Sequence, residues 1–304
     1  MVNLERQTLP ALLRAAGAEY GDRPALSRVV DKTIQPAYGY RALTEASAGF
    51  ASALAGLGIN PGDRVMILCE NRPEWAVAYF GSMMAGAVAV PVLVDFLPEQ
   101  IANVAAHAAV KAICASEKTA AKLSMIDASL PLLMIDSIKD GALDVRTDGA
   151  MKRRALSRPD GALPGDGLSP SDLACILYTS GTSGNSKGVM LTHGNIVANA
   201  IATRAVFPLR TDDRVLSVMP LAHTLESTMG LITPLLQGCS VYYLDRPPTA
   251  PVLASALLLV KPTVMVIVPL IIEKLYRAKV EPKLRDHPLY KFKQIGRASC
   301  RERV

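Results

Sequence analysis

Short apolar runs rich in β-branched residues alternate along the chain with segments whose apolar residues recur at helical spacing. We predict strands at 64–69, 88–94, 112–115, 132–135, 173–179, 215–219, 240–244 and 264–268. We predict helices at 43–57, 75–84, 99–107, 195–204, 225–236 and 251–259. Strands that alternate with helices favour largely parallel sheets covered by helices on both faces, so the sequence predicts an α/β fold. Half of the 304 residues are hydrophobic, which is enough for a large core.

The residues that follow the predicted strand 173–179 are of the types that bind a polyphosphate. Gly181 and Gly184 let the backbone turn tightly and bring its N–H groups close to an anion. Hydroxyl side chains add hydrogen-bond donors, and the ammonium group of Lys187 neutralises phosphate charge. The hydroxyl-bearing residues are Thr179, Ser180, Thr182 and Ser183. A strand, a loop of this kind and a lysine together predict a nucleotide-dependent enzyme.

Two other interpretations of this loop fit less well. The P-loop of kinases and GTPases requires Gly-x-x-x-x-Gly-Lys-Ser/Thr. Counted from Gly181, Ser186 stands at its second glycine and Gly188 at its hydroxyl position, so two of the fixed positions differ. A flexible Gly/Ser linker is disfavoured because apolar runs flank the loop on both sides.

The segment 179–188 resembles the phosphate-binding signature of the adenylate-forming superfamily, which contains acyl-CoA synthetases, luciferases and peptide-synthetase adenylation domains. That signature is Thr-Ser-Gly-Thr-Ser/Thr-Gly-x-Pro-Lys-Gly, and Ser186 stands here at the usual proline. Further segments follow the order seen in long-chain fatty-acid acyl-CoA synthetases, at 60–65, 70–75, 85–91, 219–226, 261–263 and 268–269. The resemblance implies the large N-terminal domain of these enzymes, with packed parallel-rich sheets covered by helices.

The resemblance also implies the reaction and its cofactors. A carboxylic acid, here a medium- or long-chain fatty acid, reacts with ATP in the presence of Mg²⁺ to form an acyl-adenylate and pyrophosphate. Coenzyme A then displaces AMP to form a thioester. A fatty-acyl-AMP ligase, a peptide-synthetase adenylation domain with a carrier-protein acceptor, and a non-catalytic nucleotide-binding protein are the alternatives.

Residue roles follow from the same resemblance. The β- and γ-phosphates are expected to be bound by Ser180, Gly181, Thr182, Ser183 and Gly184. Lys187 is expected to neutralise the departing pyrophosphate, and Thr179 to contact magnesium through its hydroxyl group. His223 is expected to lie against the reacting carboxylate as the second catalytic candidate, although a histidine buried in the core is the alternative.

Several neighbouring residues have simpler interpretations. Glu226 either orients His223 across one helical turn or interacts with the helix N-terminus. His193 and Trp75 are interpreted as structural. An apolar stripe is interpreted as core and not as an acyl tunnel, and it comprises Met229, Leu231, Ile232, Leu235 and Leu236.

The charge and cysteine patterns exclude some classes of function. The chain has 33 basic and 27 acidic residues, a net charge of +6, and its one basic cluster, 152–154, is interpreted as a solvated loop. No nucleic-acid partner is therefore expected. Five widely spaced cysteines predict reduced thiols in a cytoplasmic protein. The longest apolar run, 83–94, is shorter than the roughly twenty residues of a bilayer span, so we expect a soluble protein and leave peripheral membrane contact open.

The last ten residues, 295–304, show neither apolar periodicity nor a turn signature. We interpret them as translated adapter sequence, with a short exposed tail as the alternative. Residues 1–294 are then one partial AMP-binding domain with an exposed connection near 151–171. The magnesium-binding glutamate, the ribose-binding aspartate and the C-terminal catalytic lysine of related enzymes are not found in 1–294.

Overall fold

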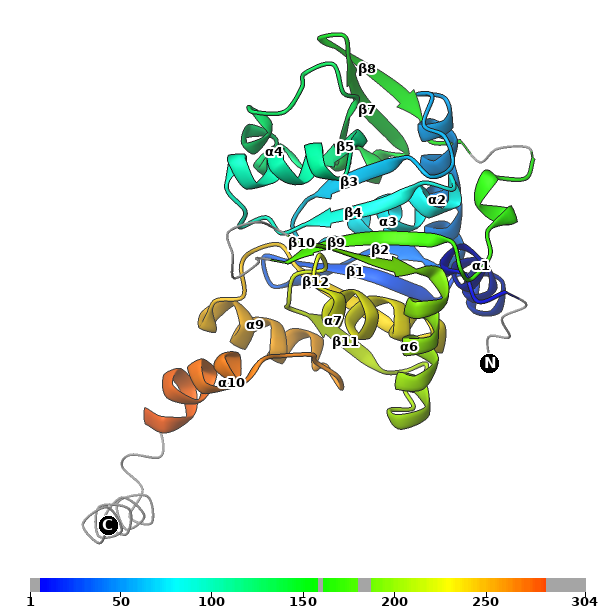
Figure 1. Cartoon of the computed structure of the whole chain (residues 1–304). Coiled ribbons are helices and arrows are strands. Elements are labelled where there is room, and N and C mark those ends of the chain that lie inside the picture. Colours follow the sequence, from blue (N-terminus) through cyan, green and yellow to red (C-terminus); the bar gives the residue numbers. More distant parts are fainter. Residues whose placement is uncertain (1–5, 158–160, 180–186, 283–304) are drawn as a thin grey trace, which may run out of the picture.

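The computed structural model describes residues 6–157, 161–179 and 187–282, and Figure 1 shows how their helices and strands are arranged. The strands are β1 Pro24–Val30, β2 Thr33–Gly39, β3 Arg64–Leu68, β4 Val88–Val92, β5 Val110–Ala115, β6 Leu132–Met134, β7 Ala142–Thr147, β8 Ala150–Ala155, β9 Leu173–Thr179, β10 Lys187–Thr192, β11 Arg214–Ser217 and β12 Ser240–Leu244. The α-helices are α1 Leu9–Tyr20, α2 Tyr40–Ala55, α3 Pro73–Met84, α4 Pro98–His107, α5 Glu117–Ala120, α6 His193–Val206, α7 Thr224–Glu226, α8 Thr233–Gln237, α9 Ala250–Val260 and α10 Pro269–Leu275. Short 3₁₀ or π segments are η1 Ala121–Leu123, η2 Ile135–Asp140, η3 Pro164–Gly167, η4 Ser227–Ile232 and η5 Tyr276–Val280.

The strands form two sheets. The larger has the order β10-β9-β4-β3-β5-β6-β7-β8, and the smaller has the order β11-β12-β1-β2. The strands from β9 to β6 are parallel, whereas β10, β7 and β8 pair antiparallel with their neighbours. In the smaller sheet β11, β12 and β1 are parallel and β2 is antiparallel. The predicted parallel-rich α/β fold is therefore confirmed, with antiparallel strands at the edges.

Alternating side chains of the strands divide the core into three layers. In β3, Val65 and Ile67 join a cluster that also contains residues of α1, α2, α3 and the smaller sheet, so helices pack between the two sheets. Met66 and Leu68 of the same strand point to the opposite face, where α4 covers the larger sheet. In β11, Leu216 joins a third cluster with α9 on the outer face of the smaller sheet. The two-residue period of these strands thus gives each sheet two buried faces.

Helix α3 lies at the centre of the middle layer. All twelve of its residues are buried, because it contacts β1 of one sheet and β3 and β4 of the other. Proline at its first position has the backbone angle a helix start needs, and the missing N–H has no helical acceptor there. Trp75 is fully buried and stacks on Tyr79 with ring centroids 4.8 Å apart, so the structural interpretation of Trp75 is confirmed.

Most other expectations about the core are also met. Leu231, Ile232, Leu235 and Leu236 are buried and Met229 is half-buried, which confirms the stripe as core. Cys69, Cys114, Cys175 and Cys239 are buried free thiols, and burial raises the pKa of each.

The structure corrects two expectations. The strand predicted at 264–268 is reduced to a single bridge between Val264 and Val215, followed by extended chain that leads into α10. We expected an exposed connection at 151–171, but its first residues belong to strand β8. The basic residues 152–154 therefore lie in a mostly exposed edge strand and not in a loop. Arg153 pairs there with Asp144 on β7.

The segment 295–304 lies outside the described residues. Within the described ranges, no helix combines the length and apolar character that a membrane crossing requires. Helix α10 extends away from the two sheets in Figure 1.

Candidate functional site

A cavity of about 530 Å³ lies where the carboxyl ends of strands from both sheets meet. Val92 ends β4, Cys69 follows β3, Ser217 ends β11 and Leu244 ends β12, and all four line the cavity. Open α/β sheets bind their ligands at this edge, because loops diverge there and leave a crevice. The cavity is therefore the candidate ligand site.

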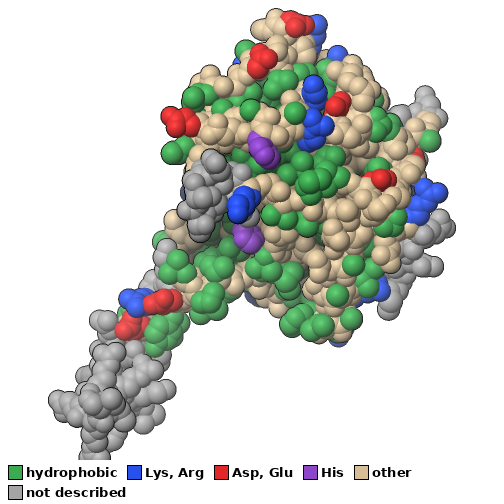
Figure 2. All heavy atoms as spheres, in the orientation of Figure 1, with side chains coloured by type: hydrophobic (Ala, Val, Ile, Leu, Met, Phe, Trp, Pro, Cys, Tyr) green, Lys and Arg blue, Asp and Glu red, His purple; other side chains and the backbone are tan. Residues whose placement is uncertain are grey.

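The cavity wall is mainly apolar, with charged groups where it meets solvent. Its apolar lining includes Val92, Val94, Val218, Leu221, Leu244 and Val268. Lys118 and Arg246 also line it, and their side chains are 71% and 61% exposed. An apolar interior with a charged mouth suits an amphipathic ligand. Figure 2 shows histidine, basic and apolar side chains on one face of the molecule.

The predicted phosphate loop begins at the same edge of the larger sheet. Strand β9 runs parallel to β4, so its end at Thr179 lies at the carboxyl edge. Lys187 is exposed at the start of β10 and pairs with Thr179 in the antiparallel register. The loop residues Ser180, Gly181, Thr182, Ser183 and Gly184, with Ser186, lie outside the described residues, as does the side chain of Thr179. The structure thus confirms the predicted strand at 173–179 and brings the two ends of the loop together.

A histidine that the sequence analysis did not single out contacts Tyr178, near the end of β9. His107 Nδ1 and the Tyr178 hydroxyl group are 2.7 Å apart, and the two rings meet edge to face. This contact joins the end of α4 to the end of β9. The 70 intervening residues hid it from sequence reasoning, since neither residue lies in a motif that names the other.

His223 lies one residue beyond the cavity lining. Its ring is exposed, and its Nδ1 accepts a hydrogen bond from the backbone N–H of Leu225 at 3.3 Å, which caps α7. In the neutral ring Nε2 then carries the proton and is the donor. The exposed ring excludes the alternative of a core histidine, and the preceding Ala222 lines the cavity.

Glu226 lies in the first turn of α7, as one of its two interpretations has it, but its carboxylate points into the core. It is 1% exposed and accepts a hydrogen bond from Ser217 Oγ at 2.5 Å. Burial raises the pKa of this carboxyl to about 7, against the hydrogen bonds from Ser217 and the backbone of Val218. This carboxylate is held by the hydroxyl group of Ser217, and the alternative interpretation, in which Glu226 orients His223 by direct contact, is wrong.

His193 is structural, as predicted. Its ring is fully buried, its Nδ1 accepts a hydrogen bond from the Leu9 N–H at 3.3 Å, and burial lowers its pKa to about 4. A neutral imidazole in this position joins α6 to the start of α1.

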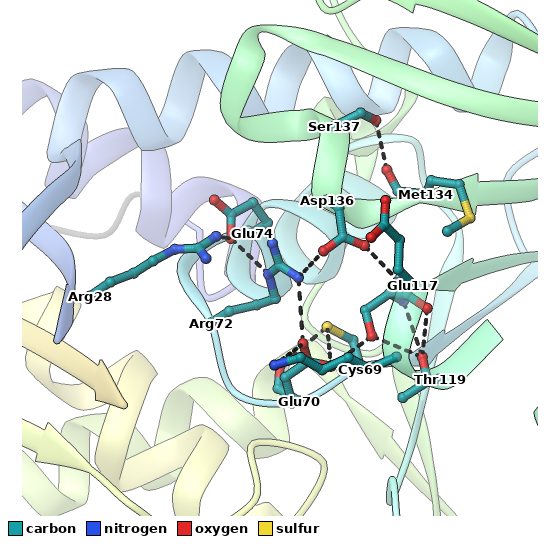
Figure 3. Close-up of polar contacts among 12 residues, drawn as sticks. Arg28, Cys69, Glu70, Arg72, Glu74, Glu117, Thr119, Met134, Asp136 and Ser137 are labelled. Atoms are coloured by element: carbon teal, nitrogen blue, oxygen red, sulfur yellow. Dashed lines mark hydrogen bonds and ion pairs between the residues drawn. The ribbon is translucent and has the colours of Figure 1, made fainter. Parts of the chain in front are cut away.

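A partly buried ionic network, shown in Figure 3, includes Glu70 of the cavity lining. Arg72 is 7% exposed and donates to Glu74 from Nε at 3.0 Å and to Asp136 from Nη1 at 2.5 Å. Glu74 also pairs with Arg28 of β1, and Glu70 lies 3.5 Å from Arg72 Nη1. Burial alone would raise the pKa of Asp136, but the hydrogen bond from Arg72 outweighs it and holds this pKa below its usual value. The network joins the smaller sheet, α3 and η2.

The described parts of the chain contain no group of three or more His, Cys, Asp or Glu side chains placed to hold a metal ion. The magnesium contact of Thr179 stays a prediction, because the side chain of Thr179 lies outside what the structure describes.

The fold and this edge define the class: a two-sheet α/β protein with its ligand site at the carboxyl ends of parallel strands. Residues 13–302 match the family described as AMP-binding enzyme, and the chain belongs to that family.

The curated relatives include proteins named as CoA ligases. Long-chain-fatty-acid–CoA ligase FadD15 of Mycobacterium tuberculosis is 32% identical over 233 residues, which are 74% of this chain and 38% of that ligase. 4-Coumarate–CoA ligase 1 of Solanum tuberosum is 26% identical over 75% of this chain and 41% of its own length. The chain thus spans about two fifths of the length of these relatives.

Solved structures share the fold. The N-terminal domain of FACL13 from Mycobacterium tuberculosis superposes with a TM-score of 0.73 at 20% identity, over 92% of this chain and 67% of that one. A benzoate CoA ligase from Burkholderia xenovorans gives a TM-score of 0.73 at 22% identity, over 90% of this chain and 52% of that one.

Proposed function

We propose that this chain is part of an ATP-dependent acid–thiol ligase that activates a medium- or long-chain fatty acid. One observation carries the proposal. The two ends of a hydroxyl-rich loop, Thr179 and Lys187, are paired at the same sheet edge as an apolar cavity of about 530 Å³. An enzyme that joins ATP to a fatty acid needs a phosphate-binding loop and an apolar pocket close together, at one edge of the sheet.

The proposed chemistry divides between the loop and the cavity. The loop residues 180–184 bind the β- and γ-phosphates of ATP, and Lys187 neutralises the departing pyrophosphate. The fatty-acid chain enters the apolar cavity, which brings its carboxylate toward His223. The carboxylate oxygen attacks the α-phosphorus, the bond to pyrophosphate breaks, and an acyl-adenylate forms. Positioning and charge neutralisation supply most of the rate enhancement in a transfer of this kind.

Magnesium fits this scheme as a partner of the ATP phosphates. Mg²⁺ prefers oxygen ligands and bridges phosphate groups, so the hydroxyl group of Thr179 is the contact proposed from this chain. Coenzyme A is the proposed thiol acceptor, and its thiolate displaces AMP to give the thioester. A carrier-protein thiol is the second candidate, on the same adenylation chemistry. The proposal places the enzyme in the cytoplasm. It includes peripheral contact with a membrane, because a fatty acid is a lipid-like substrate.

Product analysis with the full-length enzyme tests the proposal. The enzyme is incubated with ATP, Mg²⁺, coenzyme A and fatty acids from eight to eighteen carbons, and AMP and acyl-CoA are quantified. We expect one AMP per acyl-CoA, with a maximum within this range of lengths. Formation of ADP, or AMP release that does not depend on the acid, contradicts the proposal. Acyl-AMP that accumulates until a carrier protein is added favours the second candidate.

A further inference from the structure

Asn71 joins the two sheets beside the cavity. It lies between the end of β3 and the start of α3, and its side chain reaches the segment that follows β11. Its Nδ2 donates to the carbonyl oxygen of Met219 at 2.5 Å and to Ser217 Oγ at 3.3 Å. Its Oδ1 accepts from the backbone N–H of Leu221 at 2.8 Å. Both ends of the amide are therefore used by one short segment of the other sheet.

That segment forms the cavity wall and carries His223. Residues 219–222 line the cavity, and the backbone N–H of His223 donates to the Pro220 carbonyl at 2.9 Å. The two peptide groups that Asn71 holds, at Met219 and Leu221, lie on either side of Pro220. A shift of this segment would move the wall and the histidine together.

The contact continues into the core behind the segment. Ser217 Oγ accepts from Asn71 and donates to Glu226, so one line of hydrogen bonds runs from the end of β3 to α7. Glu226, the last residue in this series of hydrogen bonds, is 1% exposed, so the surrounding core holds its side chain in place. His223, whose ring caps α7, is thus held from both sides: through Asn71 at the segment and through Glu226 at the helix.

We propose that Asn71 is a positioning residue that fixes the cavity wall and the aim of His223 toward the carboxylate of the acid. The inference rests on the proposed function, since it assigns Asn71 to the acid half of that site. Within the part of the chain that the structure describes, the hydrogen bonds of the Asn71 side chain go to Ser217, Met219 and Leu221, and none goes to β9 or β10, which carry the ends of the phosphate loop. Its loss should therefore affect the acid far more than ATP.

Three variants of the full-length enzyme test the proposal. Asn71→Ala removes both ends of the amide. Asn71→Asp keeps its shape and the acceptor for Leu221, but it sets a carboxylate oxygen against the Met219 carbonyl, where the amide donates. Asn60→Ala is the matched control, because Asn60 is exposed and its side chain, among the described residues, makes one hydrogen bond, to the carbonyl oxygen of Gly58.

Steady-state kinetics are measured with acid and ATP varied separately. We expect both Asn71 variants to lower kcat/KM for the fatty acid by about tenfold to a hundredfold, the size of effect that a misplaced reacting group produces. We expect the KM for ATP to change by less than about threefold, a difference of well under 1 kcal/mol, and Asn60→Ala to match the wild type. Equal losses for acid and ATP, or an Asn71→Asp variant as active as the wild type, overturn the proposal.

Hydrogen exchange of the segment 217–226 separates this inference from the proposed function. Loss of the Asn71 contacts should speed exchange there and leave the α4 segment unchanged. Faster exchange with unchanged acid kinetics overturns the positioning role while leaving the proposed function intact. A wild-type enzyme without acid-dependent AMP formation refutes the proposed function, and the role of Asn71 toward the acid falls with it.

Discussion

Replacing the buried Glu226 by glutamine should flatten the decrease in protein stability between about pH 5 and pH 8. The carboxyl has an ordinary pKa of 4.5, and burial raises it to about 7 in the folded protein. Between these values the folded state binds more protons than the unfolded state, so the free energy of unfolding falls as pH rises. The stability that protonated Glu226 contributes is complete below about pH 4.5 and is lost as pH rises through about 7.

The difference between the two pKa values sets the magnitude. At about 1.4 kcal/mol for each pKa unit, Glu226 should lower the free energy of unfolding by about 3 kcal/mol across this window. Glutamine has the same shape, accepts the hydrogen bond from Ser217 and does not ionise. His193 titrates in the opposite direction, since burial lowers its pKa to about 4, but it is present in both proteins and cancels in the comparison.

Urea unfolding at a series of pH values measures this effect. The fluorescence of Trp75, the single tryptophan, reports unfolding because its ring is fully buried. The control is Glu99→Gln, at an exposed position in the first turn of α4. We expect the wild type and the control to lose about 3 kcal/mol more than Glu226→Gln between about pH 5 and pH 8. Parallel pH profiles for the wild type and Glu226→Gln would refute the assignment of a buried, partly protonated carboxyl.

Other consequences follow from the same structure. His193→Gln should make the protein less sensitive to acid, because wild-type stability falls by up to about 3 kcal/mol as pH drops from 6.5 through about 4; unfolding midpoints in acid check this, and an unchanged profile counts against it. Arg72→Met should cost about 3–5 kcal/mol, since it leaves the buried carboxylate of Glu74 with Arg28 alone; a loss below about 1 kcal/mol in urea unfolding contradicts it. Lys187→Ala in the full-length enzyme should lower kcat/KM for ATP about tenfold to a hundredfold, the value of a charged hydrogen bond, with the far-ultraviolet circular dichroism unchanged.

The sequence predicted several of the buried strands and helices, but it missed α1, whose buried Leu9, Leu12, Leu13 and Ala16 recur at helical spacing, and the largely buried strand β1. The strand at 173–179 was placed with its observed bounds because it is a continuous apolar run that ends in the loop motif. The edge strands β8 and β10 were not predicted, because neither has a pattern of buried apolar residues. The residues 152–154 of β8 are basic, and Val189 and Met190 of β10 are 45% and 66% exposed. An edge strand is held by backbone hydrogen bonds, which side-chain pattern does not reveal.

The candidate site was predictable in its motifs and not in its contacts. The loop and His223 stand out by residue type and by order along the chain. Asn71 lies in the segment 70–75, but the sequence assigned it no role, because its partners lie 146 to 150 residues away and are mostly backbone atoms. The environment of Glu226 was equally hidden, since only the packing of α7 against β11 decides whether its carboxylate faces His223 or Ser217. The interpretation of 295–304 as foreign sequence stays a prediction.

The most direct test of the proposed function follows one oxygen atom. A fatty acid labelled with oxygen-18 in its carboxylate is given to the full-length enzyme with ATP, Mg²⁺ and coenzyme A, and the AMP is analysed by mass spectrometry. If the carboxylate attacks the α-phosphorus, one labelled oxygen passes to each AMP when the thiol displaces it. Unlabelled AMP, or label found in inorganic phosphate with ADP as the other product, would contradict activation through an acyl-adenylate.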